Sequence, residues 1–191
     1  IPASKLSFTR RKPLFGMGIN DAGYITHLTI NGKQVACPFY RAWKGMLTRC
    51  YSHKHIERRP TYAGCTVCNE WLSFSNFKEW MITQDWVGMQ LDKDLLIQGN
   101  KVYSPEACLF VTQEINKLLS DRAAKRGVLP IGVYFNKRAG KFQATCNVNG
   151  KANHLGYFNT PAAAHDAYKL FKYELIAEAA MMHPEPLKSA L

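Results

Sequence analysis

The last third of the chain carries, at alternating positions, side chains that could bind nucleic acid. Amides, hydroxyls, aromatic rings and cations recur between positions 134 and 154, and no acidic residue occurs between Asp121 and Asp166. Such groups hydrogen-bond base edges and hold phosphates. The candidate residues are Tyr134, Asn136, Lys137, Arg138, Lys141, Gln143, Thr145, Asn147, Lys151 and His154. The alternative is an ordinary solvated surface, in which we would expect Glu to be mixed with Lys.

Three strands must position these side chains. They are predicted over 132–138, 141–149 and 151–158, separated by the tight-turn dipeptides Ala139-Gly140 and Asn149-Gly150. Alternation along the strands puts all of the candidate residues except Lys137 and Lys151 on one face. The opposite face is apolar and carries Val133, Phe135, Phe142, Ala144, Cys146 and Val148.

One helix can cover that apolar face. Thr160 and Pro161 begin it, and its apolar residues Ala164, Ala167, Tyr168, Phe171 and Leu175 repeat at helical spacing. We therefore expect a three-stranded antiparallel sheet packed on one α-helix, with the polar face open.

Charge is distributed unevenly along the 191 residues, whose net charge is +11. Residues 1–60 carry eleven Lys or Arg against two acids, residues 61–119 four against seven, and residues 120–191 ten against five. The basic parts favour a polyanionic partner, either nucleic acid or an acidic membrane surface. The acidic middle favours a metal site, because carboxylates bind hard cations.

Neither a membrane span nor a secretory signal is predicted. No run approaches the roughly 18–20 apolar residues that cross a bilayer, and Arg10, Arg11 and Lys12 precede no apolar run. Because a disulfide framework is typical of small secreted domains, the six cysteines are expected to be reduced. We expect a cytoplasmic protein.

The first two thirds divide into short predicted elements. They are a hairpin over 24–37 with an Asn31-Gly32 turn, a helix over 38–50, a surface loop over 52–64, a helix from Ser73 or Ser75 to about 83, and a helix over 112–124. Trp71, Phe74, Phe77 and Trp80 recur at spacing three, and we interpret them as core residues rather than platforms for bases.

The run from 130 to 179 resembles the plant Apetala/ethylene-response-factor DNA-binding domain, which also occurs in phage nucleases. The matching segments are Gly-Val-Tyr at 132–134, Gly-Lys-Phe at 140–142 and His-Leu-Gly-Tyr-Phe-Asn-Thr-Pro-Ala-Ala-Ala-His-Asp-Ala-Tyr at 154–168. In that family the sheet enters the major groove. Its Arg and Trp contact positions correspond to Tyr134, Asn136, Arg138, Thr145, Asn147 and His154. The resemblance implies binding to double-stranded DNA.

Residues 38–119 resemble the phage homing endonucleases of the HNH type. The segments that carry the resemblance are Trp-Lys-Gly-Met-Leu-Thr-Arg-Cys-Tyr at 43–51, Val-Cys-Asn-Glu-Trp at 67–71, Leu-Asp-Lys at 91–93 and Tyr-Ser-Pro-Glu-Ala-Cys at 103–108. HNH nucleases hold one divalent metal between a hairpin and a helix, and a neighbouring His activates the water. The resemblance therefore implies a ββα-metal fold and metal-dependent cleavage of DNA phosphodiester bonds.

The resemblance also assigns catalytic positions. The first and last metal ligands correspond to Asp92 and Asn116, which would bind Mg²⁺ or Mn²⁺. Lys93 stands at the position of the general-base His, and Ala107 at the position of the middle Asn. A lysine serves as a base only when burial or neighbouring charge makes it much less basic than usual.

Simpler roles stay open for several of these residues. Asp92 and Asp94 could be capping or salt-bridging carboxylates. His53 or His55 could act as the base in place of Lys93, or could be solvated in its loop.

Cys65 and Cys68 form half of a zinc signature, which Cys50 and Cys108 could complete as a four-thiolate site. The alternative is that these cysteines are buried packing residues.

The sequence thus predicts an α+β protein with five parts. They are a basic arm and hairpin over 1–37, an HNH-like nuclease region over 38–124, a linker over 125–130, an Apetala-like DNA-binding domain over 131–180 and a frayed tail over 181–191. The favoured function is a phage-type, HNH-like DNA endonuclease. The rivals are a catalytically inactive DNA-binding or regulatory protein on the same framework, and a phage factor that binds a host protein.

Overall fold

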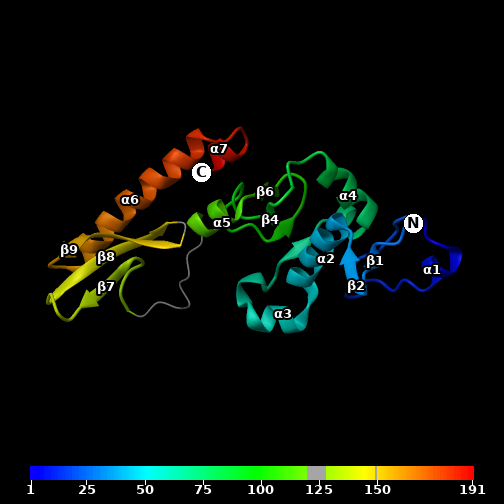
Figure 1. Ribbon diagram of the computed structural model, residues 1–191, viewed down its shortest axis with the longest axis horizontal. Helices are drawn as coiled ribbons and strands as arrows, with labels where there is room; N and C mark the ends of the chain where they lie inside the picture. Colours follow the sequence, from blue (N-terminus) through cyan, green and yellow to red (C-terminus); the bar gives the residue numbers. More distant parts are fainter. Residues whose placement is uncertain (120–127, 149) are drawn as a thin grey trace. The chain divides into compact units, whose positions relative to one another are not determined.

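The computed structural model describes residues 1–119, 128–148 and 150–191. The chain forms two compact units, Ile1–Val111 and Thr112–Leu191 (Figure 1). Both units combine helices with small sheets, so the predicted α+β class is confirmed. Within the described ranges, no helix is long and apolar enough to cross a membrane.

The first unit is built from short elements. Its helices are α1 (Lys5–Thr9), α2 (Pro38–Tyr51), α3 (His53–Arg58) and α4 (Phe74–Ile82), with 3-10 turns η1 (Pro60–Tyr62) and η2 (Asn69–Leu72). Its two-stranded sheets are β1 (His27–Ile30) with β2 (Lys33–Ala36), β3 (Thr66–Val67) with β5 (Val102–Tyr103), and β4 (Gln90–Asp92) with β6 (Leu109–Val111). The β3–β5 pair is parallel and the other two pairs are antiparallel.

Aromatic side chains from α2, η2 and α4 form the core of this unit. Trp43 and Phe74 are fully buried, with ring centroids 5.5 Å apart, and the Trp43 indole N–H donates to the Trp71 carbonyl at 2.7 Å. Trp71 and Phe77 are likewise buried, and Trp80 packs against the same cluster. The prediction that the aromatic residues at spacing three are core is confirmed.

The basic arm folds onto this core. The Ile19 N–H donates to the last carbonyl of η2 at 2.7 Å, and the Ile19 carbonyl accepts from the Phe74 N–H at 3.0 Å. Asp21 accepts the Ser75 N–H at 2.8 Å and the hydroxyls of Ser73 and Ser75. Burial raises the pKa of Asp21, but these hydrogen bonds outweigh it and leave the pKa below its usual value. The start of α4 is therefore capped by Asp21, to which the two serines predicted as caps donate.

The hairpin and the helix predicted over 24–37 and 38–50 are confirmed, although the strands are shorter than expected. Asn31 and Gly32 both have positive φ, 50° and 72°, as a two-residue type I′ turn requires. Pro38 is the first residue of α2, where its missing N–H costs no hydrogen bond.

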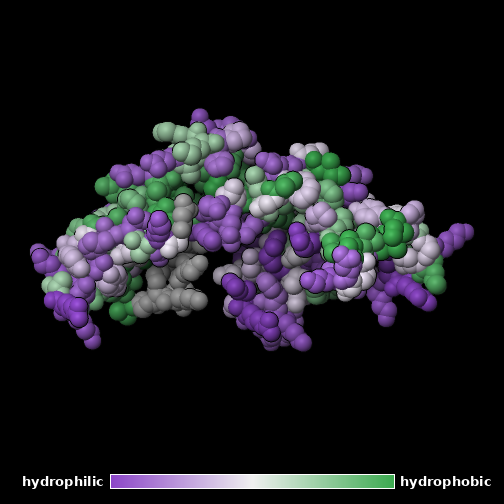
Figure 2. Space-filling model, in the orientation of Figure 1, coloured by the Kyte–Doolittle hydropathy of each residue, from purple (hydrophilic) through white to green (hydrophobic). Residues whose placement is uncertain are grey.

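The surface loop predicted over 52–64 is wrong in part, because it contains α3 and η1. The Ser52 carbonyl accepts the N–H groups of His55 and Ile56 at 2.9 and 3.0 Å and so starts a helical turn directly after α2. This turn is held by local backbone bonds and has no apolar stripe, so hydrophobic periodicity could not reveal it. Figure 2 shows strongly hydrophilic side chains over α3.

The second unit contains one three-stranded sheet. Its elements are α5 (Gln113–Leu119), β7 (Val133–Asn136), β8 (Lys141–Val148), β9 (Lys151–Phe158), α6 (Pro161–Met181) and α7 (Leu187–Ala190). The sheet is antiparallel with strand order β7-β8-β9, as predicted. The predicted helix over 112–124 is observed as α5, and its positions 120–124, like linker positions 125–127 and strand position 149, lie outside the described residues.

One face of this sheet is covered by α6. Ala144 and Cys146 of β8 and Ala164 and Tyr168 of α6 are buried, which confirms the predicted inward face. Phe135 shares that face but is 48 % exposed, since it lies at the loop end of the hairpin and packs against the Phe142 ring. The Thr160 hydroxyl accepts the Ala163 N–H at 3.2 Å, so the predicted helix start is confirmed.

The frayed tail predicted over 181–191 is wrong at its end. Residues Leu187–Ala190 form α7, and the Leu187 side chain is buried. The Ser189 N–H donates to the Glu185 carboxylate at 3.1 Å, which holds the start of this turn. A single buried leucine among polar residues carries no periodic signal, which is why the sequence did not predict this turn.

We predict that Gly132→Ala will destabilise the second unit more than Gly140→Ala. Both glycines have positive φ, 77° and 62°, but a Cβ on Gly132 would lie 2.1 Å from Tyr168 Cδ2, whereas one on Gly140 meets open space. Strain alone costs about 1–2 kcal/mol, and overpacking adds about 1–3 kcal/mol. Urea unfolding followed by far-UV circular dichroism measures the difference.

Tryptophan fluorescence is the internal control, because Trp43, Trp71, Trp80 and Trp86 all lie in the first unit. Its urea transition should not move in either variant. Equal losses of stability in the two variants would contradict the close approach of Gly132 to Tyr168.

Candidate functional site

The open face of the sheet brings most of the candidate nucleic-acid-binding residues together. Strand register sets Tyr134, Gln143 and Tyr157 side by side across the three strands. Neighbouring rows pair Asn136 with Lys141, Thr145 with His154, and Asn147 with Ala152. Helix α6 packs against the opposite face of the sheet.

The remaining predicted cations lie at the ends of the sheet. Lys137 and Arg138 are in the exposed loop between β7 and β8, beside Lys141. Hydrophilic side chains gather at this end, at the lower left of Figure 2. Lys151 pairs with Val148, so register places it on the helix side of the sheet, away from the other predicted residues.

Side chains on the open face are joined by hydrogen bonds across the strands. The Asn136 amide nitrogen donates to Gln143 Oε1 at 3.2 Å and to the Tyr157 hydroxyl at 3.4 Å. Gln143 Nε2 and His154 Nδ1 are hydrogen-bonded at 2.8 Å, and the His154 and Tyr157 rings lie 4.7 Å apart between centroids. The face is therefore one connected network rather than a set of separate side chains.

Asn136 also closes the β7–β8 loop. Its Oδ1 accepts the backbone N–H groups of Arg138 and Ala139, each at 3.1 Å. With two bonds accepted and two donated, the amide has used its full hydrogen-bonding capacity. Asn136 is thus a residue that shapes the face, not one that offers free groups to a ligand.

Tyr157 is a residue of this face that the sequence analysis missed. Strict alternation from His154 would turn position 157 towards the helix. The pairing shifts between Ala144 and Thr145 of β8, so that Leu155 has no partner opposite it, and Gly156 takes φ 130°. This bulge reverses the alternation and brings Tyr157 to the open face. The glycine inside a strand pattern was the signal that could have found it.

In the first unit, Asp92 ends β4 and shapes the turn that follows. Its Oδ1 accepts the N–H groups of Asp94 and Leu95 at 2.8 and 2.9 Å. This is the capping role that the sequence analysis left open. Both of these N–H groups donate to Oδ1, so the turn does not use Oδ2 of this half-buried carboxylate.

Lys93 is buried, with 4 % of its surface exposed. Its ammonium donates to the Asp94 carboxylate and, at 2.6 Å, to the Asn100 carbonyl. The Asn100 side chain in turn donates to the carbonyls of Lys93 and Val102 at 2.8 and 2.6 Å. In this arrangement Lys93 is a structural donor that closes the loop between β4 and β5.

A second cation lies beside this loop. The Arg49 Nε donates to the Tyr103 hydroxyl at 2.8 Å, and the guanidinium lies 5.2 Å from the Tyr103 ring centroid. Lys93 Nζ is 5.9 Å from the same ring. Arg49 and Tyr103 were not singled out by the sequence, because long-range contacts leave no local pattern.

The Cys108 thiol lies close enough to Asp92 to respond to its charge. Burial raises the pKa of the Cys108 thiol to about 12, and the negative charge of Asp92 contributes to the rise.

The other predicted catalytic positions lie on different elements. Asn116 lies on α5 in the second unit, whereas Asp92 lies in the first. Ala107 is buried just before β6. His53 is exposed, and its Nδ1 lies 3.4 Å from Glu57 Oε1. The His55 ring packs against the Tyr62 ring, with centroids 5.5 Å apart.

The cysteines proposed as zinc ligands are free thiols. Cys50, Cys65 and Cys108 are buried, and Cys68 is partly buried. Burial raises the pKa of Cys50 to about 12, and the neighbouring Cys65 adds to the rise. Among the residues that the structure describes, no three His, Cys, Asp or Glu side chains are arranged to hold a metal ion. Packing residues are the interpretation that these contacts favour.

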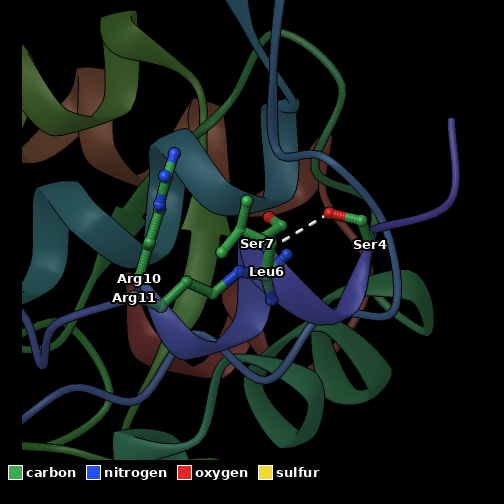
Figure 3. A pocket seen from close by; sticks show the side chains of 5 residues that line it. All are labelled: Ser4, Leu6, Ser7, Arg10 and Arg11. Atoms are coloured by element: carbon green, nitrogen blue, oxygen red, sulfur yellow. Dashed lines mark hydrogen bonds between the residues drawn. The ribbon is translucent and has the colours of Figure 1, made fainter.

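A shallow hollow on α1 is lined by Ser4, Leu6, Ser7, Arg10 and Arg11 (Figure 3). Arg11 donates to the carbonyls of Asn20, Ala22 and Tyr24 at 2.6 to 3.0 Å and lies over the Phe8 ring. Its guanidinium therefore holds the arm together. Of the two arginines that line the hollow, Arg10 is the one whose charge could bind a ligand.

Comparison with protein-family models, curated proteins and solved structures finds no match for this chain.

We predict that Asp92→Asn will keep the first unit stable, whereas Asp92→Ala will destabilise it by about 1 kcal/mol. An asparagine oxygen can still accept the two N–H groups, but alanine leaves both without their partner. Urea unfolding followed by tryptophan fluorescence measures this, since all four tryptophans lie in the first unit. A loss as large in Asp92→Asn as in Asp92→Ala would mean that the charge, not the hydrogen bonds, holds the turn.

Proposed function

We propose that the chain is a DNA-binding, HNH-like endonuclease, which binds duplex DNA through the open face of the β7–β8–β9 sheet. The observation that carries the proposal is this face. It is left uncovered by α6, it is polar, its described strands carry no acidic residue, and Lys137, Arg138 and Lys141 lie at one end. An ordinary solvated surface, which is the alternative interpretation, would instead carry acidic and basic side chains mixed together. Cations at the rim would hold phosphates while the face approaches the bases.

The proposed cleavage site is the turn after β4. Asp92 uses Oδ1 to accept both backbone N–H groups of the turn, so a cation could bind Oδ2 without unfolding the turn. The order of elements also supports the proposal. The antiparallel β4–β6 pair is followed in the chain by α5, which is the order of two strands and a helix in the ββα-metal fold of HNH nucleases.

A hard divalent cation such as Mg²⁺ or Mn²⁺ suits a carboxylate and an amide oxygen. Asp92 would hold it in the first unit, and the HNH resemblance assigns the last ligand to Asn116. Such a cation would stabilise the negative charge that develops at the scissile phosphate. Arg49, which contacts Tyr103 beside this turn, would contribute positive charge.

One observation favours a second candidate, a catalytically inactive DNA-binding protein on the same framework. Lys93 occupies the position of the general base but is buried and donates to Asp94 and Asn100. A residue engaged in this way holds a loop and is not placed to accept a proton from water. The two candidates share the sheet face and differ only in the chemistry at Asp92.

Binding is tested by replacing cations at the loop end of the face. The double variant Arg138→Gln with Lys141→Gln should bind duplex DNA more weakly. The slope of log K against log salt should fall in magnitude by about 1.8, since each phosphate contact contributes about 0.9. A fluorescence-anisotropy titration at several salt concentrations measures both quantities.

The matched control is Lys169→Gln with Lys188→Gln, which removes two exposed cations from α6 and α7, away from the open face. The control should keep the wild-type slope. If both double variants change the slope equally, DNA is held by general positive charge and not by this face.

Cleavage is tested by incubating the full chain with supercoiled plasmid and Mg²⁺ or Mn²⁺. We expect nicking that EDTA abolishes and that Asp92→Asn reduces at least a hundredfold, because that variant keeps the turn but loses the charge. Asp85→Asn, an exposed acid in the same unit, is the control and should nick like the wild type. Binding without nicking across several plasmids would favour the inactive candidate.

A further inference from the structure

We propose that the open face of the sheet binds unpaired bases by stacking them on Tyr134 and Tyr157, so that the DNA substrate of this chain contains a single-stranded stretch. The shared chemistry is an unpaired polynucleotide, either DNA or RNA. This inference rests on the proposed function, because the cations at the loop end would still hold the phosphates of the duplex, while the face itself takes bases from an unpaired stretch beside it.

The first argument is that the amides of Asn136 and Gln143 are already engaged with neighbouring side chains of the face. Asn136 uses all four of its hydrogen-bonding positions within the protein. Gln143 accepts from Asn136 and is also bonded to His154. Reading base edges in a duplex groove needs free donors and acceptors in fixed geometry. These side chains would have to break protein hydrogen bonds to supply them.

The second argument is that two aromatic side chains of the same face are about half exposed. Tyr134 is 46 % exposed and Tyr157 is 47 % exposed. Both lie in one row, on either side of Gln143. The rings offer π faces that stack on any base without disturbing the network below them.

The third argument is the spacing of the row. Neighbouring strands lie about 4.8 Å apart, so the two tyrosines are separated by about 10 Å across the sheet. That distance suits two unstacked bases of a splayed single strand, as on sheet surfaces that bind RNA. Bases inside a duplex remain stacked on one another and present only their edges to a protein.

His154 strengthens one of the two platforms. Its ring lies 4.7 Å from that of Tyr157, and its Nδ1 is bonded to Gln143. Tyr157 is therefore held in two ways. Its ring packs against the His154 ring, and its hydroxyl accepts a hydrogen bond from the Asn136 amide. Such a ring is held in place before the ligand arrives, which reduces the entropy lost on binding.

The test compares three labelled probes of equal length, about 16 nucleotides, which is the upper site size of a single-strand binding fold. They are oligo(dT), oligo(U) and a blunt DNA duplex, titrated with the full chain by fluorescence anisotropy. We expect oligo(dT) or oligo(U) to bind at least as tightly as the duplex. The better of the two shows whether the face prefers the DNA or the RNA polymer.

Variants then separate stacking from hydrogen bonding. Tyr134→Ala and Tyr157→Ala should each weaken single-strand binding about tenfold. Tyr134→Phe and Tyr157→Phe keep the ring and should bind within about twofold of the wild type. Tyr173→Ala removes a tyrosine that is 76 % exposed on α6, outside the face, and should have no effect. Unchanged circular dichroism spectra confirm that each variant is folded.

The outcomes distinguish this inference from the proposed function. Tight duplex binding with single-strand binding at least tenfold weaker, and unaffected by the alanine variants, would overturn the inference and leave the proposed function standing. Equal losses in the alanine and phenylalanine variants would also overturn it, because the hydroxyls and not the rings would then bind. If none of the three probes binds, both the inference and the proposed function fail.

Discussion

The packing of α6 on one face of a three-stranded sheet determines what the second unit can do. Ala144 and Cys146 of β8 meet Ala164 and Tyr168 of α6, and Gly132 lets the Tyr168 ring lie directly against the backbone. One helix can bury only one face of such a sheet, so the other face must be stable in water. Hydrogen bonds join Asn136, Gln143, His154 and Tyr157 on that face, while the side chains of Tyr134 and Tyr157 stay about half exposed.

The turn after β4 shows how a structural and a chemical role can share one carboxylate. Asp92 accepts both N–H groups of the turn with Oδ1, so the turn does not depend on its Oδ2. Lys93 is different, because burying an ammonium requires partners, and Asp94 and Asn100 supply them. The HNH resemblance assigns the general base to the position of Lys93, but here this residue stabilises the loop between β4 and β5. This is the strongest physical reason to keep an inactive DNA-binding protein as the second candidate.

The sequence predicted those parts of the fold that depend on local signals. Asn31-Gly32 fixes a hairpin, the apolar positions of α2 and α6 follow helical spacing, and alternation on β8 identifies the buried face. The sequence did not predict features that depend on backbone hydrogen bonds or on residues far apart in the chain. The helical turn α3 lacks an apolar stripe, and the cap of α4 comes from Asp21, more than fifty residues earlier.

The candidate site was predictable to the same extent. Alternation placed Tyr134, Gln143, Thr145 and His154 on one face, and register confirms this arrangement. The bulge at Gly156 reversed the alternation, so Tyr157 could not be found by counting. Arg49 and Tyr103 meet across 54 positions of sequence, a distance over which no spacing rule operates.

The most direct measurement of the central claim, that the open sheet face is the nucleic-acid interface, is an amide chemical-shift titration of the isotope-labelled full chain. The ligand would be a DNA duplex with a central single-stranded gap. We predict that the largest shifts will come from Tyr134, Gln143 and Tyr157 and their cross-strand neighbours, with little change at Leu170 and Tyr173 on the far side of α6. Shifts concentrated on α6, or spread over the first unit with the sheet unaffected, would contradict the claim.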